Sequence, residues 1–275
     1  MYFHIIASGS KGNATLVATN KTRILIDMGI SLCRLEEGLA EINLKKEDID
    51  ACFFTHDHTD HIGGIKFLSP KKMYALEGTL PTTLSNVIVE YVPVTIGEFT
   101  ITAFKTSHDA TNPCGYKLES NGETLVYMTD TGVFLEENLP LIKNPNYLII
   151  ECNHDISMLL KTDRPFQLKE RILSDHGHLC NEDSAVAAIS IIGDKTKEIV
   201  LAHISEEANT PEIALDAYKK VFAHFGVRFA TRILYLSNLT PKWAKTFLYA
   251  SRAISGVFAS SEIWALIHYD LPHQC

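Results

Sequence analysis

The sequence of 275 residues lacks the features of several special classes of protein. It contains no run of about 18 apolar residues, which is the length that a membrane-spanning helix needs. It also contains no internal repeat, no low-complexity tract and no linker rich in glycine and serine. With 46% hydrophobic and 21% charged residues, the composition is typical of a globular protein that buries a large core.

Closely spaced cysteines and an excess of positive charge are absent as well. No two of the six cysteines form a Cys-x-x-Cys pair, which favours reduced thiols in a cytoplasmic protein. Residues 1–4 do not begin a basic region followed by a long apolar stretch, so we expect no secretory signal. The net charge of −8 disfavours non-specific coating of nucleic acid, although a local basic group could still bind a polyanion.

The first half of the chain consists mainly of short β-rich segments, and Asn121-Gly122 is a strong signal for a hairpin turn between two of them. These expected strands are 2–7, 14–18, 22–27, 51–55, 99–105, 115–119 and 124–129. The second half alternates strands at 147–151, 198–202 and 233–236 with helices at 166–174, 181–193 and 210–224. We expect Asn181 to cap the second of these helices. The order predicts an α/β protein with two mixed β-sheets flanked by helices.

We expect residues 1–240 to form one domain and residues 241–275 to form a helical tail. Apolar residues recur in the tail at intervals of three or four, which is typical of an amphipathic helix. They are Trp243, Phe247, Ala250, Ile254 and Val257. Such a helix would pack on the domain or form the contact of a homodimer.

The most specific motif is His-x-His-x-Asp-His at residues 56–61, which directly follows an apolar strand. Imidazole nitrogens and carboxylate oxygens suit Zn²⁺ or Mn²⁺. His56 and His58 can point the same way from an extended loop, whereas Asp60 and His61 turn towards a neighbouring point as a helix begins. One short segment can therefore provide ligands for two adjacent metal ions.

Three further residues of ligand type follow expected strands. They are His108, Asp130 and His203. Each repeats the placement of the histidine-rich motif at the end of an apolar strand, so we expect them to complete the metal site.

These motifs, in this order, resemble the metallo-β-lactamase superfamily, and most closely its phosphodiesterase branch with ribonuclease Z-type and PhnP-type enzymes. Shorter segments resemble the YycJ/WalJ/VicX-type branch, which is linked to exonuclease action on DNA. These segments are residues 8–13, 25–29, 151–155, 177–181 and 203–207. The resemblance extends over about residues 1–238 and implies an αβ/βα sandwich with a dinuclear site along one edge. Cys180 stands where the resemblance leads us to expect a small hydroxyl residue.

The resemblance also implies how the ligands divide between two divalent ions, zinc or manganese, with iron as a further option. One ion would bind His56, His58 and His108, and the other would bind Asp60, His61 and His203. Asp130 would bridge the two ions. Asp27 would orient the motif without binding a metal ion, as groups behind metal ligands generally do.

Hydrolysis of a phosphodiester requires an acid that protonates the leaving oxygen, and histidine has a suitable pKa near neutral pH. His178 is our candidate, because it resembles the Gly-His element of the ribonuclease Z branch, and Glu151 is the candidate for orienting it. Together with Asp60 they form the expected catalytic set. His176 could share or take the role of the acid.

Two regions are expected to contact substrate. The polar, glycine-rich turn at 8–13 can cradle an anion, and its candidate residues are Ser8, Lys11 and Asn13. A local basic group follows the strand at 147–151 and would contact a polyanion. It consists of Lys161, Arg164, Lys169 and Arg171. His154 is either a substrate contact or a polar residue satisfied by its neighbours.

We therefore expect a dinuclear metal-dependent phosphodiesterase that acts on nucleic acid as a DNA exonuclease, with the 5′-to-3′ direction suggested by the resemblance. The alternative is a hydrolase of the same fold that acts on a cyclic phosphodiester, a lactone or a thioester. A di-iron redox protein is less consistent with the sequence, because such a protein normally has a glutamate in the histidine-rich motif. Too few residues separate Asp130 from His203 for the large insertion of ribonuclease J-type enzymes, which favours a compact enzyme.

Overall fold

The computed structural model describes residues 1–227 and 232–235. The expected tail at 241–275, with its apolar stripe and its role in a dimer, lies outside the described residues. None of the helices within the described ranges is both long enough and apolar enough to cross a lipid bilayer.

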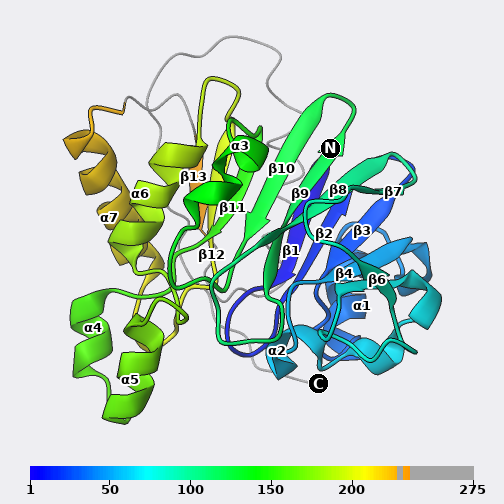
Figure 1. Ribbon diagram of the computed structural model, residues 1–275, viewed down its shortest axis with the longest axis horizontal. Coiled ribbons are helices and arrows are strands. Elements are labelled where there is room, and N and C mark those ends of the chain that lie inside the picture. Colours follow the sequence, from blue (N-terminus) through cyan, green and yellow to red (C-terminus); the bar gives the residue numbers. More distant parts are fainter. Residues whose placement is uncertain (228–231, 236–275) are drawn as a thin grey trace.

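Two mixed β-sheets lie face to face between layers of helices (Figure 1). The first sheet has the strand order β1 (Tyr2–Ala7), β2 (Ala14–Ala18), β3 (Arg23–Ile26), β4 (Ala51–Phe54), β5 (Met73–Leu76) and β6 (Asn86–Ile88). The second sheet has the order β13 (Arg232–Tyr235), β12 (Glu198–Ala202), β11 (Tyr147–Glu151), β10 (Glu123–Met128), β9 (Cys114–Ser120), β8 (Phe99–Lys105) and β7 (Val94–Ile96). The predicted sandwich of two mixed sheets flanked by helices is thereby confirmed.

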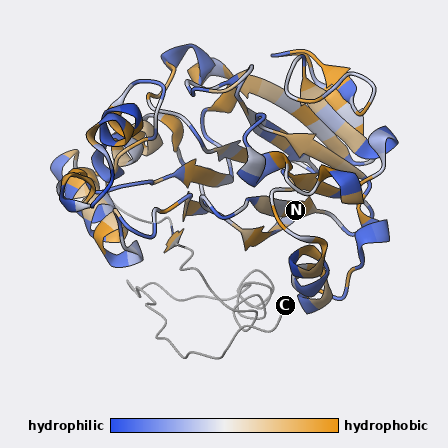
Figure 2. Ribbon diagram, turned by 90° about the horizontal axis from the view of Figure 1, so that it is seen from below, coloured by the Kyte–Doolittle hydropathy of each residue, from blue (hydrophilic) through white to orange (hydrophobic). Residues whose placement is uncertain are grey.

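The helices cover the outer face of each sheet. They are α1 (Leu32–Glu41), α2 (Thr59–Ile62), α3 (Leu139–Ile142), α4 (Ile156–Lys161), α5 (Phe166–Leu173), α6 (Asn181–Ile191) and α7 (Pro211–His224). α1 packs on the first sheet, and α3, α6 and α7 pack on the second. α4 and α5 project from the sandwich as a two-helix hairpin (Figure 1). Leu159 and Ile172 pack inward, whereas Leu160, Phe166 and Leu173 are exposed, so the surface of these helices mixes polar and apolar residues, as do the helices in Figure 2.

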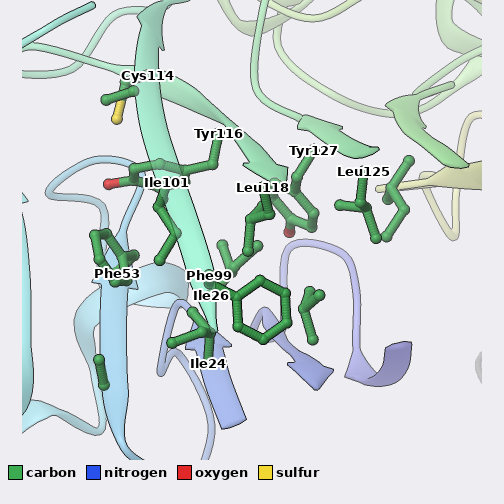
Figure 3. Packing of buried hydrophobic residues seen from close by; sticks show 14 of the residues in the cluster. Ile24, Ile26, Phe53, Phe99, Ile101, Cys114, Tyr116, Leu118, Leu125 and Tyr127 are labelled. Carbon is green, nitrogen blue, oxygen red and sulfur yellow. The ribbon is translucent and has the colours of Figure 1, made fainter. Parts of the chain in front are cut away.

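The inner core results from the alternation of side chains along the strands. Ile24, Ile26 and Phe53 of the first sheet point towards the second sheet, whereas Leu25 points to the α1 side. Phe99 and further residues of the second sheet meet them (Figure 3). Since both faces of the central strands are covered, these strands are apolar nearly throughout, which explains why they were recognisable in the sequence.

Most expected elements are present, with ends that differ by one or two residues. The hairpin at Asn121-Gly122 is confirmed, because β9 and β10 pair antiparallel and both turn residues have a positive φ. The cap of α6 was wrong: the cap is Cys180, whose Sγ accepts a hydrogen bond from the N–H of Asp183, and Asn181 is buried. The thiol thus occupies the capping position where we expected a hydroxyl. The sequence did not predict β5, β6, β7, α1, α3 or α4.

The strands that precede the expected site residues all run in one direction within their sheet. In the first sheet, β1, β3 and β4 are mutually parallel in sense. In the second sheet, β8, β10, β11 and β12 are likewise parallel in sense. The loops that follow these strands therefore emerge at one edge of each sheet, where ligand sites are commonly found.

Gly29 lets the chain after β3 approach the histidine-rich motif. A Cβ atom at Gly29 would lie 1.5 Å from the carbonyl oxygen of Asp60, which itself accepts a hydrogen bond from the N–H of Asn13. We expect Gly29→Ala to lower the free energy of unfolding by at least ~3 kcal/mol, the upper end of the usual cost of overpacking. Chemical denaturation measures this effect.

Gly122→Ala is the matched control. Gly122 has a φ of 78°, a left-handed conformation that disfavours a side chain, but no atom lies within 4 Å of its added Cβ. We expect it to lose only about 1–2 kcal/mol, which is the cost of the left-handed conformation. Equal losses in the two variants would contradict the steric role of Gly29.

Candidate metal centre

The ligand-type side chains predicted from the sequence converge at the edge where the two sheets meet. Among the residues that the structure describes, there are four overlapping groups, and within each group the ligand atoms lie within 4.8 Å of one another. The groups are His56, His58 and His108; His56, His61 and Asp130; Asp60, His61 and His203; and Asp130, Glu151, His178 and His203. All seven expected ligands, including Asp60, are therefore brought together, along with His178 and Glu151, the other two residues of the expected catalytic set.

Three imidazoles form the first part of the cluster. The ring centroids of His56 and His58 are 4.7 Å apart. The ring centroid of His108 lies 5.1 Å from that of His56 and 5.0 Å from that of His58. His56 follows β4, His58 is the residue before α2, and His108 follows β8. The three rings thus surround one point, although they come from both sheets.

Asp130 lies between this group and the second one. Its Oδ1 is 3.9 Å from Nε2 of His108 and 3.6 Å from Nε2 of His203, and its Oδ2 is 3.5 Å from Nε2 of His61. Burial disfavours ionisation, but His203 and the other imidazoles around Asp130 hold the pKa of its carboxyl well below the ordinary value. The carboxylate is therefore charged and faces both groups of ligands.

Several of these atoms are buried without a hydrogen-bonding partner. Among the described residues, Nε2 of His56, Nε2 of His203 and Oδ2 of Asp130 have none. Buried polar atoms in proteins are nearly always paired, so three such atoms in one cluster indicate a missing partner. Burial also lowers the pKa of His56, and the neutral imidazole keeps a lone pair for a metal ion. These residues fit divalent metal ions.

In four of the histidine ligands the outer nitrogen, Nδ1, has a partner behind the cluster. Nδ1 of His61 is 2.8 Å from Oδ2 of Asp27, and Nδ1 of His56 is 3.0 Å from Oγ1 of Thr55. Nδ1 of His108 donates to a backbone carbonyl, that of Gly177, and Nδ1 of His203 is 2.9 Å from Oε1 of Glu151. Each partner turns the Nε2 atom of its histidine into the cluster, which is the usual role of groups behind metal ligands.

Asp27 stabilises the histidine-rich motif by hydrogen bonds from outside the cluster of ligands. Its carboxylate is fully buried and accepts hydrogen bonds from the N–H and the hydroxyl of Thr55 as well as from His61. This geometry agrees with the orienting role that we expected. Thr55 was not predicted as a site residue, although its position directly before the motif was a usable signal.

Glu151 connects the cluster with His178. Its Oε1 is 2.8 Å from Nδ1 of His178 and 2.9 Å from Nδ1 of His203, while Oε2 accepts hydrogen bonds from the backbone of Thr131 and Leu179. Burial opposes ionisation, but His178 and the hydrogen bonds lower the pKa of Glu151 to about 2. A charged carboxylate therefore fixes the orientation of both imidazoles.

The backbone at three of the site residues is strained. Asp27, Asp130 and His203 have φ values of 60°, 57° and 53°, a region that residues with a side chain seldom adopt. Each of them follows the end of a strand. Such conformations persist at functional sites because the surrounding contacts enforce them.

Two side chains of the turn at residues 8–13 contact histidines of the cluster. Oγ of Ser8 accepts a hydrogen bond from the N–H of His203, and Nδ2 of Asn13 lies 2.9 Å from Nε2 of His61. Asn13 is fully buried, so the structure corrects its expected role as a substrate contact. Lys11 is largely exposed and pairs with Glu206.

A cavity of about 140 Å³ lies beside the cluster. Its lining includes His178, His203, Arg164 and Arg171, whereas Lys161 and Lys169 do not line it. Nζ of Lys169 instead donates to backbone carbonyls near the end of α4, so the structure divides the expected basic group in two.

Two further histidines lie outside the lining of the cavity. His154 is buried, and neither of its ring nitrogens has a partner among the described residues. Its burial disfavours substrate contact, and its unpartnered nitrogens do not fit the alternative of a residue satisfied by its neighbours. His176 is exposed and contacts Oγ of Ser107, so the geometry favours His178 over His176 as the acid.

Comparison with known proteins agrees with this geometry. The sequence matches the beta-lactamase superfamily domain over residues 22–204. It is 37% identical over 227 residues to exodeoxyribonuclease WalJ of Streptococcus pneumoniae serotype 2 (strain D39 / NCTC 7466), covering 77% of this chain and 84% of that protein. It is 36% identical over 248 residues to exodeoxyribonuclease YycJ of Bacillus anthracis, covering 85% of this chain and 94% of that protein. The crystal structure of the metallo-beta-lactamase fold protein YhfI from Bacillus subtilis superimposes with a TM-score of 0.64 at 21% identity, over 86% of this chain and 96% of that one.

The contacts of Asp27 lead to a prediction about metal affinity. Asp27→Asn removes the charge that holds His61 and Thr55. The imidazole of His61 then loses its fixed orientation, and so does that of His56, which contacts Thr55. We expect the affinity for Zn²⁺ or Mn²⁺ to fall by roughly 10- to 100-fold, the usual effect of removing such a partner. Calorimetric titration of the metal-free protein measures this. Asp50→Asn is the control, since Asp50 is an exposed carboxylate that accepts a backbone hydrogen bond from β3. An unchanged affinity in Asp27→Asn would refute the orienting role.

Proposed function

The chain belongs to the beta-lactamase superfamily, and from this premise we propose that it is a dinuclear phosphodiesterase that degrades DNA as an exonuclease. It is a metal-dependent hydrolase, as its family and its relatives show. One observation supports the finer assignment most strongly. The buried carboxylate of Glu151 holds both a ligand of the cluster, His203, and the partly exposed His178, which lines the adjoining cavity.

We assign His56, His58 and His108 to one metal ion, and Asp60, His61 and His203 to a second, with Asp130 between them. The mixture of imidazole and carboxylate ligands suits zinc or manganese, and iron is a further option. When bound, such ions lower the pKa of water and neutralise charge on phosphoryl oxygens.

The residues of the chain supply the proton for the leaving group. Glu151 accepts the hydrogen of Nδ1 of His178 and stabilises the charged imidazolium, much as an aspartate supports histidine in a catalytic triad. Nε2 of His178 is the nitrogen that remains for proton transfer. We therefore propose that it donates a proton to the leaving oxygen as general acid.

DNA is the proposed substrate because the two relatives described above are named exodeoxyribonucleases and because two arginines line the cavity. Degradation from 5′ to 3′ is the proposed direction. A small cyclic phosphodiester is the second candidate substrate, because the same groups of ligand residues and His178 could act on it.

Activity assays with matched substrates test this function. Protein loaded with Zn²⁺ or Mn²⁺ should shorten 5′-labelled single- or double-stranded DNA progressively from one end. RNA, a cyclic dinucleotide and bis-p-nitrophenyl phosphate complete the set. Hydrolysis of small esters without any degradation of DNA would favour the second candidate.

The proposed ligand division predicts two metal ions per chain. Elemental analysis of the folded protein after saturation should give a ratio near two. Asp130→Ala should lower the occupancy of both sites because Asp130 faces both groups of ligands, whereas His203→Ala should mainly empty one site. A ratio of one in the unmodified protein would contradict the bridging position of Asp130.

His178→Ala should separate metal binding from catalysis. Since the seven proposed ligands remain, the metal content should be unchanged, but turnover of DNA should fall by about 10²–10⁴-fold, the usual contribution of a general acid. The loss should be much smaller with bis-p-nitrophenyl phosphate, whose leaving group departs without a proton. His176→Ala is the control and should retain activity. An equal loss on both substrates would make His178 a phosphate-binding residue.

A further inference from the structure

The cavity beside His178 has positively charged side chains on the wall formed by the α4–α5 hairpin. Arg164 lies between the two helices, and Arg171 lies on α5. Ser10 and Ser205 line the cavity from two loops that follow strands β1 and β12. The cavity therefore combines two guanidinium groups with two hydroxyl groups next to the metal centre.

The hairpin wall is packed against the body of the protein. Leu159 of α4 and Ile172 of α5 form a small buried cluster with Ala208, and Leu168 packs against it. Arg171 and Ile172 follow Leu168 by three and four residues, so the three residues share one face of α5. All three line the cavity. Arg171 thus lies on the face of α5 whose apolar residues anchor the helix to the body of the protein.

Both arginines are also fixed by carboxylates at the rim. Nε of Arg164 is 2.8 Å from Oε2 of Glu207, and Nε of Arg171 contacts Oδ2 of Asp109, the residue after the ligand His108. Because a guanidinium carries five N–H donors, each arginine can bind a further anion while it keeps its carboxylate. The free N–H groups of both guanidiniums and the hydroxyls of Ser10 and Ser205 favour an anion with several acceptor oxygens.

A phosphate monoester meets this requirement better than a phosphodiester. It carries a charge of about −1.5 to −2 at neutral pH and has three acceptor oxygens, whereas an internal phosphodiester carries one negative charge. The volume of about 140 Å³ is also small compared with the ~300–1,000 Å³ of pockets that enclose drug-sized molecules. It suits a phosphate group and part of a sugar.

We propose that this cavity binds the terminal phosphate monoester of a nucleic-acid strand through Arg164 and Arg171. The proposal rests on the phosphodiesterase function and deepens it, because it makes the end of the strand the recognised feature. His178 and His203 belong both to the cavity lining and to the metal centre. A terminal phosphate held here brings the adjoining phosphodiester to the metal centre, which gives a physical reason for cleavage from an end.

Binding and turnover with matched strand ends test the proposal. Single-stranded DNA oligonucleotides of one sequence carry a 5′-phosphate, a 3′-phosphate or hydroxyl groups at both ends. Fluorescence anisotropy on metal-free protein measures binding, and turnover is measured with Mn²⁺. One phosphorylated end should bind roughly 10- to 100-fold more tightly than the hydroxyl end, in line with charge-assisted hydrogen bonds. The two phosphorylated arms show which end the cavity accepts.

Arg164→Gln and Arg171→Gln should each abolish most of this preference, because the phosphorylated strand should lose much more affinity than the hydroxyl-ended strand. Arg232→Gln is the matched control, because Arg232 pairs with Glu198 where strands β12 and β13 begin, opposite the strand ends that supply the metal centre. It should keep the preference. If Arg171→Gln does not fold, Arg164→Gln and competition by inorganic phosphate carry the test.

Equal binding of phosphorylated and hydroxyl ends by the unmodified protein would overturn the proposal, whereas degradation of DNA would still support the nuclease function. Conversely, tight binding of one phosphorylated end without cleavage of any nucleic acid would support the cavity and refute the nuclease function. A preference that survives both arginine substitutions would place the phosphate elsewhere.

Discussion

The attraction between the buried carboxylate of Asp130 and the imidazoles around it is the interaction on which the arrangement of the site depends. The residue follows a strand of the second sheet, but it faces His61 from the first sheet as well as His108 and His203 from the second. A buried carboxylate is costly unless positive charge or hydrogen bonds compensate it. The edges of the two sheets must therefore meet closely enough to bring compensating groups from both sides.

Two further carboxylates, one on each sheet, orient side chains of the metal centre in the same way. Asp27, after β3, holds His61 and Thr55, and Glu151, at the end of β11, holds His178 and His203. Both carboxylates are fully buried, so their hydrogen bonds are not weakened by water. Each carboxylate thus fixes two side chains, so the proposed metal ligands are held rigidly by residues that lie outside the ligand set.

The elements that the sequence predicted share a physical cause. Central strands such as β3, β4 and β12 are apolar on both faces because helices cover one face and the other sheet covers the second. The short edge strands β6 and β7 bury few of their side chains, so their sequences carry little hydrophobic pattern. α1 was missed although Leu32, Leu35 and Leu39 recur at three and four residues, so its apolar stripe was a usable signal.

By itself, the sequence determined which residue types are available to bind metal ions and in what order, because the spacing of the histidine-rich motif is local and chemically specific. It also determined the layered α/β architecture through the alternation and length of its apolar segments. Only the tertiary structure decided that Asn13 is buried against His61, that Arg164 and Arg171 line the cavity while Lys169 caps α4, and that Glu151 serves two histidines. These outcomes depend on side-chain directions and on left-handed backbone conformations at Asp27, Asp130 and His203, which long-range packing imposes and which no local sequence pattern records.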